Sequence, residues 1–242
     1  MAYSGSAARG VGFLPGSPQL YLLAALGCTI LESIPILDQI AQVPFFQQGE
    51  WLLSRAFHTQ YKWLLYTTPK ILIGVTGAAF LFLFLASFTA KYRSRLHAWR
   101  KPSLLIVSSI ALVPLTVASL KALTGVYSPV DMTPYGGTQP HIGLLEQLWT
   151  YGVPSGGRSF PAGHASGGFA LMSLYSLPVQ KRWKRLLFGF GLFAGWAMGL
   201  YQMARGEHFL SHTLTAMFLA LAIIYALDSF AGASRPGSGI GR

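Results

Sequence analysis

The chain has 242 residues, of which 52% are hydrophobic and only 10% are charged. An ordinary soluble domain carries about 25% charged residues, so this composition excludes a water-covered globular surface and indicates a membrane protein. The net charge of +11 could suit nucleic acid, but nine of the eighteen Lys and Arg residues fall into two short clusters between apolar runs. There is neither a continuous basic face nor a nucleic-acid motif, so we expect no nucleic-acid partner.

Six apolar stretches are long enough to cross a bilayer as helices, which takes about 20 residues each. They cover residues 20–37, 71–90, 103–123, 161–180, 186–204 and 209–227. The sequence therefore predicts an all-α, multi-pass membrane protein with six transmembrane helices, which form one domain over residues 1–230. Residues 231–242 are rich in Gly, Ser and Arg and are predicted to be a disordered tail.

The basic residues predict the orientation in the membrane. Lys and Arg cluster in residues 91–101 and again in residues 181–185, so both loops are expected in the cytoplasm, together with both termini. Segments 38–70 and 124–160 and the turn at 205–208 then face the other side, which is the periplasm for a bacterial inner membrane. Segment 38–70 holds charges and seven aromatic residues, which predicts surface-lying helices, either as a lipid-entry wall or as a plain connector.

Four ionisable residues are expected to meet at that outer face. Lys121 ends the third span, His164 opens the fourth, and Arg205 and His208 lie at the turn between the fifth and the sixth. A lone histidine or lysine at a helix end is often only interfacial. Several such residues at one membrane depth, however, indicate a functional site.

The chemistry of these residues suits phosphate. Residues 159–164 predict a helix start, with Ser159 as the N-cap and Pro161 in the first turn. The N–H groups of residues 162–164, among them Gly163, would then be free to bind a phosphate at the helix N-terminus. Lys121, Arg205 and Arg158 are the cations expected to neutralise the phosphoryl oxygens.

Two histidines can divide the remaining work. One attacks phosphorus and forms a phosphohistidine, and the other protonates the leaving oxygen. Histidine suits both roles because its pKa lies near neutrality. His208 and His212 are also spaced like a zinc-binding pair, but no third ligand is evident, so no metal site is predicted.

The order and spacing of these residues resemble the type 2 phosphatidic acid phosphatase superfamily of membrane lipid phosphatases. Its motifs K-x6-R-P, P-S-G-H and S-R-x5-H-x3-D correspond to residues 121–129, 161–164 and 201–212. The resemblance covers roughly residues 70–228. Residues 120–137 and 157–171 look most like a bacterial branch that acts on lipid A or undecaprenyl phosphates.

The resemblance implies that His208 is the nucleophile, that His164 is the general acid and that Lys121 binds phosphate, without a metal or cofactor. The expected partner is a phosphorylated membrane lipid of the lipid A, undecaprenyl pyrophosphate or phosphatidylglycerol phosphate class. A lipid-to-lipid phosphotransferase shares the first chemical step. A non-catalytic membrane protein that keeps the fold is the other alternative. A vanadium-dependent haloperoxidase has a related site, but six spans argue against it.

Four positions depart from the family pattern. Ser128 and Gln202 stand where the family has Arg, and Ala162 stands in place of Ser. We expect Arg158 and Arg205 to supply the missing cations. His212 stands where the family has the Asp that orients the nucleophile. The candidates for that orienting group are His212, Glu207 and Asp131, and Asp131 is preferred because a carboxylate is the better orienter.

Overall fold

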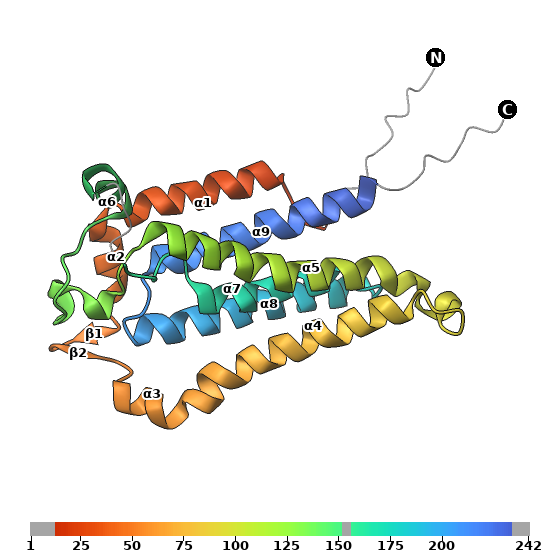
Figure 1. Ribbon diagram of the computed structural model, residues 1–242, viewed down its shortest axis with the longest axis horizontal. Helices are drawn as coiled ribbons and strands as arrows, with labels where there is room; N and C mark the ends of the chain where they lie inside the picture. Colours follow the sequence, from red (N-terminus) through yellow and green to blue (C-terminus); the bar gives the residue numbers. More distant parts are fainter. Residues whose placement is uncertain (1–12, 152–155, 234–242) are drawn as a thin grey trace, which may run out of the picture.

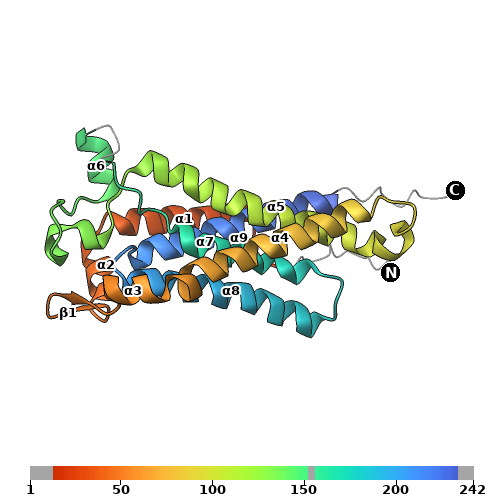
Figure 2. The ribbon, with the colours of Figure 1, turned by 60° about the horizontal axis from the view of Figure 1, so that its bottom comes forward.

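The structure is a computed structural model that describes residues 13–151 and 156–233. The chain is mostly helical over those residues, as predicted. Long helices run side by side along the long axis of the molecule (Figure 1, Figure 2). They are α1 (Pro18–Glu32), α4 (Thr68–Ala86), α5 (Arg93–Thr124), α8 (Lys181–Ala204) and α9 (Leu210–Ala233).

The helices confirm a multi-pass membrane protein but not the predicted number of spans. Four helices in the described part are long and apolar enough to cross a bilayer: Arg55–Ala86, Arg93–Asp131, Lys181–Ala204 and Leu210–Phe230. A fifth crossing results only if α1 and α2 (Pro35–Gln42) count as one broken span, because the chain bends there by 86°. The first predicted helix, residues 20–37, is therefore interrupted after Glu32.

The predicted fourth span is a shorter helix inside the bundle. Helix α7 runs from Gly163 to Ala170 and continues as the 3-10 helix η4 from Leu171 to Ser176. Ala165, Phe169 and Met172 have no exposed surface. Helices α5, α8 and α9 all pack against α7, so its small and apolar side chains fill the centre of the molecule.

Glycines on one face of α8 let the neighbouring helices come close. Gly191, Gly195 and Gly199 recur every four residues, which places them on the same side of the helix. A Cβ atom on Gly195 would lie 2.1 Å from the ring of Phe169, and one on Gly199 would lie 2.5 Å from the side chain of Thr213. Small residues at this spacing are typical of close helix packing in membranes.

The outward faces of the long helices are apolar. On α4, the side chains of Leu72, Val75 and Phe82 are each more than half exposed. Such side chains are at home in a lipid bilayer and lose free energy in water. The surface of the bundle therefore agrees with the membrane environment that the composition predicts.

The connector at residues 38–70 differs from the predicted pair of surface helices. A short hairpin follows α2, in which strand β1 (Phe46–Gln47) pairs antiparallel with β2 (Glu50–Trp51). Helix α3 (Arg55–Lys62) then passes through a π-helical turn, η1 (Trp63–Thr67), into α4. Residues 55–86 thus form one continuous helix, which bends where α3 meets α4 (Figure 1).

The basic loops and the histidine-bearing turn lie at opposite ends of the bundle. The loop from α4 to α5 lies at one end, and α8 begins there (Figure 2). The α8–α9 turn, the hairpin and helix α6 (Leu144–Tyr151) lie at the other end (Figure 1). Of the predicted tail, residues 231–233 belong to α9, and residues 234–242 lie outside the described part.

Candidate functional site

The predicted site residues gather around the turn between α8 and α9. Gly206 gives this turn a φ of +74°, which glycine adopts without strain. Neighbouring segments hold the turn through its backbone: Leu53 N–H donates to the Ala204 carbonyl at 3.0 Å, and Val130 N–H donates to the Gly206 carbonyl at 2.8 Å. The position of His208, two residues further on, is therefore set by several parts of the chain.

Buried carboxylates from the N-terminal helices hold two other helix ends. Asp38 of α2 is 3% exposed. Its Oδ1 accepts a hydrogen bond from Ser211 N–H at 2.9 Å, and its Oδ2 accepts one from the Ser211 hydroxyl. Glu32 likewise accepts from Leu144 N–H at the start of α6, at 2.8 Å. Because a carboxylate stabilises the N-terminus of a helix, Asp38 fixes the start of α9 beside His208.

Ser159 lies between the two histidines of the third motif. Its Oγ donates to the Glu207 carbonyl at 2.5 Å, and it lies 3.1 Å from Nδ1 of His208 and 3.1 Å from Nδ1 of His212. Because the hydroxyl proton is directed at the carbonyl, Oγ acts as an acceptor for the ring nitrogens. His208 then carries its proton on Nδ1 and keeps the lone pair on Nε2.

This position of Ser159 corrects two predictions. Helix α7 begins at Gly163 with Ala162 as its N-cap, and no side chain caps it, so Ser159 is not the cap. The Ala162 N–H donates to the His212 carbonyl at 3.0 Å and is not available to a ligand. The first-turn N–H groups without an intrahelical partner therefore begin at Gly163.

The group predicted to orient His208 is also different. Asp131 is exposed, at the end of the 3-10 helix η2 (Pro129–Asp131). The Glu207 carboxylate turns to Arg205, which it meets at 3.0 Å. The group on Nδ1 of His208 is Ser159, so a hydroxyl takes the place expected for the Asp131 carboxylate.

His212 is packed behind His208. It has no exposed surface, and Nε2 has no hydrogen-bond partner among the described residues. The Nδ1 atom of His212 faces Ser159, so His212 shares the orienting hydroxyl with His208. Across residues 13–151 and 156–233, no group of three or more His, Cys, Asp or Glu side chains is placed to hold a metal ion.

Two of the predicted cations reach this site. Lys121, near the end of α5, lies against Gly163, where a Cβ atom would be 3.4 Å from its Nζ. The guanidinium of Arg205 donates to Gln202 Oε1 at 2.7 Å and to Glu207 Oε1 at 3.0 Å. Gln202, which occupies the position of the motif arginine, thus holds the arginine that lies three residues later.

The third predicted cation, Arg158, is exposed. Its charge acts on Lys121 across the mouth of the site, but no contact with either histidine is seen in the described part of the chain. Arg158 therefore contributes to the local potential and does not replace the missing motif arginine in space.

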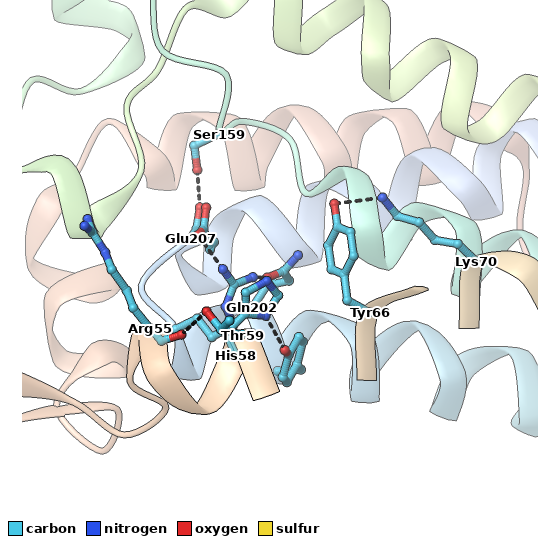
Figure 3. Close-up of polar contacts among 10 residues, drawn as sticks. Arg55, His58, Thr59, Tyr66, Lys70, Ser159, Gln202 and Glu207 are labelled. Carbon is cyan, nitrogen blue, oxygen red and sulfur yellow. Dashed lines mark hydrogen bonds and ion pairs between the residues drawn. The ribbon is translucent and has the colours of Figure 1, made fainter. Parts of the chain in front are cut away.

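His164 is buried beneath an aromatic side chain that the motifs do not contain. Its ring stacks on Tyr66 of η1, with the ring centroids 4.4 Å apart and an angle of 10° between the planes. The Tyr66 hydroxyl accepts a hydrogen bond from Lys70 Nζ at 2.7 Å (Figure 3). Sequence reasoning missed both residues, although Lys70 is a charge at the border of an apolar run, four residues after an aromatic one.

The electrostatic environment favours neutral His208. Burial lowers its pKa well below the ordinary value of 6.5, and the nearby His212, Lys121 and His164 lower it further because each adds positive potential. A neutral imidazole has a free lone pair, which is the form that can act as a nucleophile.

A cavity of about 670 Å³ adjoins the turn. Its wall includes the Arg205–Glu207 pair and ionisable side chains from the connector and from η2, among them Glu50, Arg55, His58 and Asp131. Figure 3 shows Arg55, His58 and Glu207 at this side of the site. Neither His164 nor His208 lines the cavity, so it lies next to the histidines and shares Arg205 with them.

Comparison with known proteins gives one match. No curated protein and no solved structure matches the chain. The model of the PAP2 superfamily matches residues 102–235, more than half of the chain. That range contains Lys121, His164, Arg205 and His208, whereas Tyr66 and Lys70 precede it. The chain therefore belongs to the PAP2 superfamily, whose members are phosphatases.

Proposed function

We propose that the protein is a lipid phosphatase that works through a phosphohistidine at the periplasmic face of a bacterial inner membrane. The observation that carries this proposal is the environment of His208. Its pKa is lowered, Ser159 holds its Nδ1 at 3.1 Å, and its Nε2 is left as the nucleophile. The charge of Lys121 acts on His208 and that of Arg205 acts on His164, so both cations are assigned to the phosphoryl oxygens.

In the first step, the lone pair of His208 Nε2 attacks phosphorus. An N–P bond forms while the P–O bond to the lipid breaks, and His164 gives a proton to the leaving oxygen. In the second step, water attacks phosphorus, the N–P bond breaks and the proton of the water passes to His164. Lys121, Arg205 and the N-terminus of α7 stabilise the charge that develops on the phosphoryl oxygens.

The periplasmic placement rests on the arrangement of charge. The basic loops and the histidines lie at opposite ends of the bundle (Figure 1), and Lys and Arg are retained on the cytoplasmic side of membranes. Both termini of the helical bundle are then cytoplasmic. The substrate is a lipid monophosphate or pyrophosphate of the lipid A, undecaprenyl pyrophosphate or phosphatidylglycerol phosphate class, and the cavity beside Arg205 has room for its polar head group.

Phosphate release from these lipids tests the proposal. The full chain, purified in detergent, is incubated with each lipid in the presence of EDTA. Phosphate release is expected from wild type and from His97→Ala, because His97 is exposed at the basic end of α5. His208→Ala and His164→Ala are expected to abolish it. Equal activity of all four proteins would exclude this site.

A second lipid in the same assay separates hydrolysis from phosphotransfer. With a lipid alcohol present as acceptor, a phosphatase releases inorganic phosphate, whereas a phosphotransferase forms a new lipid phosphate. Acid-labile, alkali-stable labelling of the wild-type protein by a ³²P-labelled lipid identifies the phosphohistidine. His208→Ala should not be labelled, because it lacks the attacking nitrogen.

A further inference from the structure

The cations described so far do not balance the charge of a phosphate ligand. A phosphate monoester carries about −1.5 to −2 charge at neutral pH. Arg205 is already paired with Glu207 at 3.0 Å, so that pair contributes little net charge. Arg158 contacts neither histidine in the described part of the chain, and Ser128 offers no charge. Arg205 can still donate hydrogen bonds to the phosphoryl oxygens, but of the predicted cations Lys121 is the one that adds net charge against a ligand with almost two negative charges.

Lys70 is a further cation at the same place. Its Nζ donates to the Tyr66 hydroxyl at 2.7 Å and lies 3.9 Å from the centroid of the Tyr66 ring. Tyr66 in turn stacks on His164 at 4.4 Å. The charge of Lys70 acts on both His164 and Lys121. Lys70 therefore stands one aromatic ring away from the proposed general acid.

We propose that Lys70 is a phosphate-binding residue and that Tyr66 positions both Lys70 and His164. This inference rests on the proposed function. An ammonium group has three donors, of which one is used by the Tyr66 hydroxyl. The other two are available to phosphoryl oxygens. With Lys121, Lys70 brings the positive charge of the site to the level of a phosphate dianion.

The backbone supports a specific role for this segment. Tyr66 lies in η1, the π-helical turn that joins α3 to α4, and short π-helical turns occur frequently at functional sites. The continuous helix from Arg55 to Ala86 is long and apolar enough to span a membrane, and an ionisable residue within such a helix indicates function. The side chain of Lys70 is exposed, so a ligand can reach its ammonium group, and the contact with the Tyr66 ring holds that group near His164.

Binding of inorganic phosphate tests the role of Lys70 without requiring turnover. Isothermal titration calorimetry of the full chain in detergent is done with wild type, Lys70→Met, Lys70→Arg and Tyr66→Phe. Lys91→Met is the matched control, because Lys91 is exposed in the loop before α5. We expect Lys70→Met to bind phosphate about tenfold more weakly, which corresponds to one charged hydrogen bond.

The other variants separate charge from position. Lys70→Arg should restore most of the affinity, since it keeps the charge. Tyr66→Phe keeps the ring on His164 but loses the hydroxyl that holds Lys70, so we expect a smaller loss, of a few fold. Tyr66→Leu removes the stack on His164 and should lower kcat with the lipid substrate while KM changes less, because a misplaced general acid affects the chemical step.

The outcomes distinguish this inference from the proposed function. Wild-type affinity for phosphate in Lys70→Met, with a wild-type melting temperature in phosphate-free buffer, overturns the inference even if lipid hydrolysis is found. A wild-type protein that does not bind phosphate overturns it as well. Phosphate binding that depends on Lys70, in a protein that hydrolyses no lipid phosphate, supports the inference and contradicts the phosphatase.

Discussion

Among single residues, Ser159 has the contacts that matter most for the histidine pair. A hydroxyl that donates to the Glu207 carbonyl at 2.5 Å has only its lone pairs left for the two imidazoles. It thereby selects the same tautomer that a carboxylate would select, without adding a negative charge. Neutral His208 is thus maintained by burial and by a dipole, and the positive potential of the site remains available to the substrate.

Removal of this hydroxyl should slow the reaction with little effect on the fold. In Ser159→Ala the tautomer of His208 is no longer selected, and we expect kcat to fall about tenfold or more, the equivalent of one hydrogen bond in the transition state. Ser173→Ala is the control, because Ser173 in η4 is equally buried and its hydroxyl donates to the Ala170 carbonyl of α7, away from the histidines. Equal rates in both variants would show that Ser159 is not an orienting group.

The pH dependence of kcat/KM follows from the lowered pKa of His208. The free enzyme needs neutral His208 as nucleophile and protonated His164 as general acid, so His208 sets the acid limb of the profile and His164 sets the basic limb. Since the pKa lies well below 6.5, the acid limb of the profile should lie below pH 6.5. The substrate phosphate also ionises near pH 6. Its ionised fraction is therefore measured by ³¹P NMR, and kcat/KM is corrected for that fraction at each pH. In Lys121→Met the limb should move to higher pH, because a positive neighbour is lost.

An acid limb at or above pH 6.5 would show that the group that must be neutral is not His208 in this environment. An unchanged limb in Lys121→Met would show that Lys121 does not act on the nucleophile. Both results are read from the pH at which kcat/KM falls. Loss of Lys121 also lowers the rate itself, but this does not change the pH at which the fall occurs.

At the scale of elements, the site depends on how helix ends are joined. The α8–α9 turn passes through Gly206 at a φ of +74°, and the Trp51 ring of the hairpin packs directly on it. A Cβ atom on Gly206 would lie 2.4 Å from that ring. The hairpin, which the motifs do not include, therefore acts as a cover that keeps Arg205 and His208 in place.

A comparison of Gly136 with Gly206 separates the effect of backbone strain from the effect of the contact with Trp51. Gly136 also has a positive φ, +83°, but a Cβ atom there would meet nothing within 4 Å. Gly136→Ala should cost about 1–2 kcal/mol from backbone strain alone and leave the rate unchanged. Gly206→Ala should lower the melting temperature further and reduce kcat about a hundredfold, because a shift of about 1 Å at catalytic groups has that effect.

The comparison is made by thermal melting in detergent together with the phosphatase assay. Similar losses of rate in both variants would mean that the contact between Gly206 and Trp51 does not position the site. A melting temperature of Gly206→Ala equal to that of Gly136→Ala would mean that the hairpin yields to the added methyl group.

At the scale of the whole molecule, the bundle separates two kinds of positive charge. One kind lies in the basic loops at one end, and the other lies among the histidines at the opposite end, where Lys121 and Arg205 are partly buried. In the proposed function, the first kind sets the orientation and the second binds the substrate. This division makes the orientation testable without an assay of activity.

Reporters fused into the two ends should lie on opposite sides of the membrane. Alkaline phosphatase, which is active only in the periplasm, should be active when inserted near residue 140, and green fluorescent protein should not fluoresce there. Insertion near residue 92 should give the reverse. Fluorescence near residue 140 would contradict the orientation, and the same result at both places would contradict a membrane crossing between them.

The sequence predicts the membrane environment and the helical class, and it indicates His164 and His208 as the candidate catalytic pair. These follow from local properties: runs of apolar residues that are long enough to span a bilayer, and motif residues that stand at helix ends. It also indicated that Arg205 could serve for the arginine missing at residue 202, since positions three apart share a helix face, and Gln202 does hold Arg205 at 2.7 Å.

The groups that surround those histidines, in contrast, follow from the tertiary structure. Ser159 reaches His208 across 49 residues of chain, Asp38 reaches Ser211 across 173, and Tyr66 covers His164 from a helix outside the matched family region. Such contacts depend on how helices pack, and no local pattern encodes them. The interruption of the first predicted helix after Glu32 has a local cause instead, because Pro35 cannot continue a helix and starts α2.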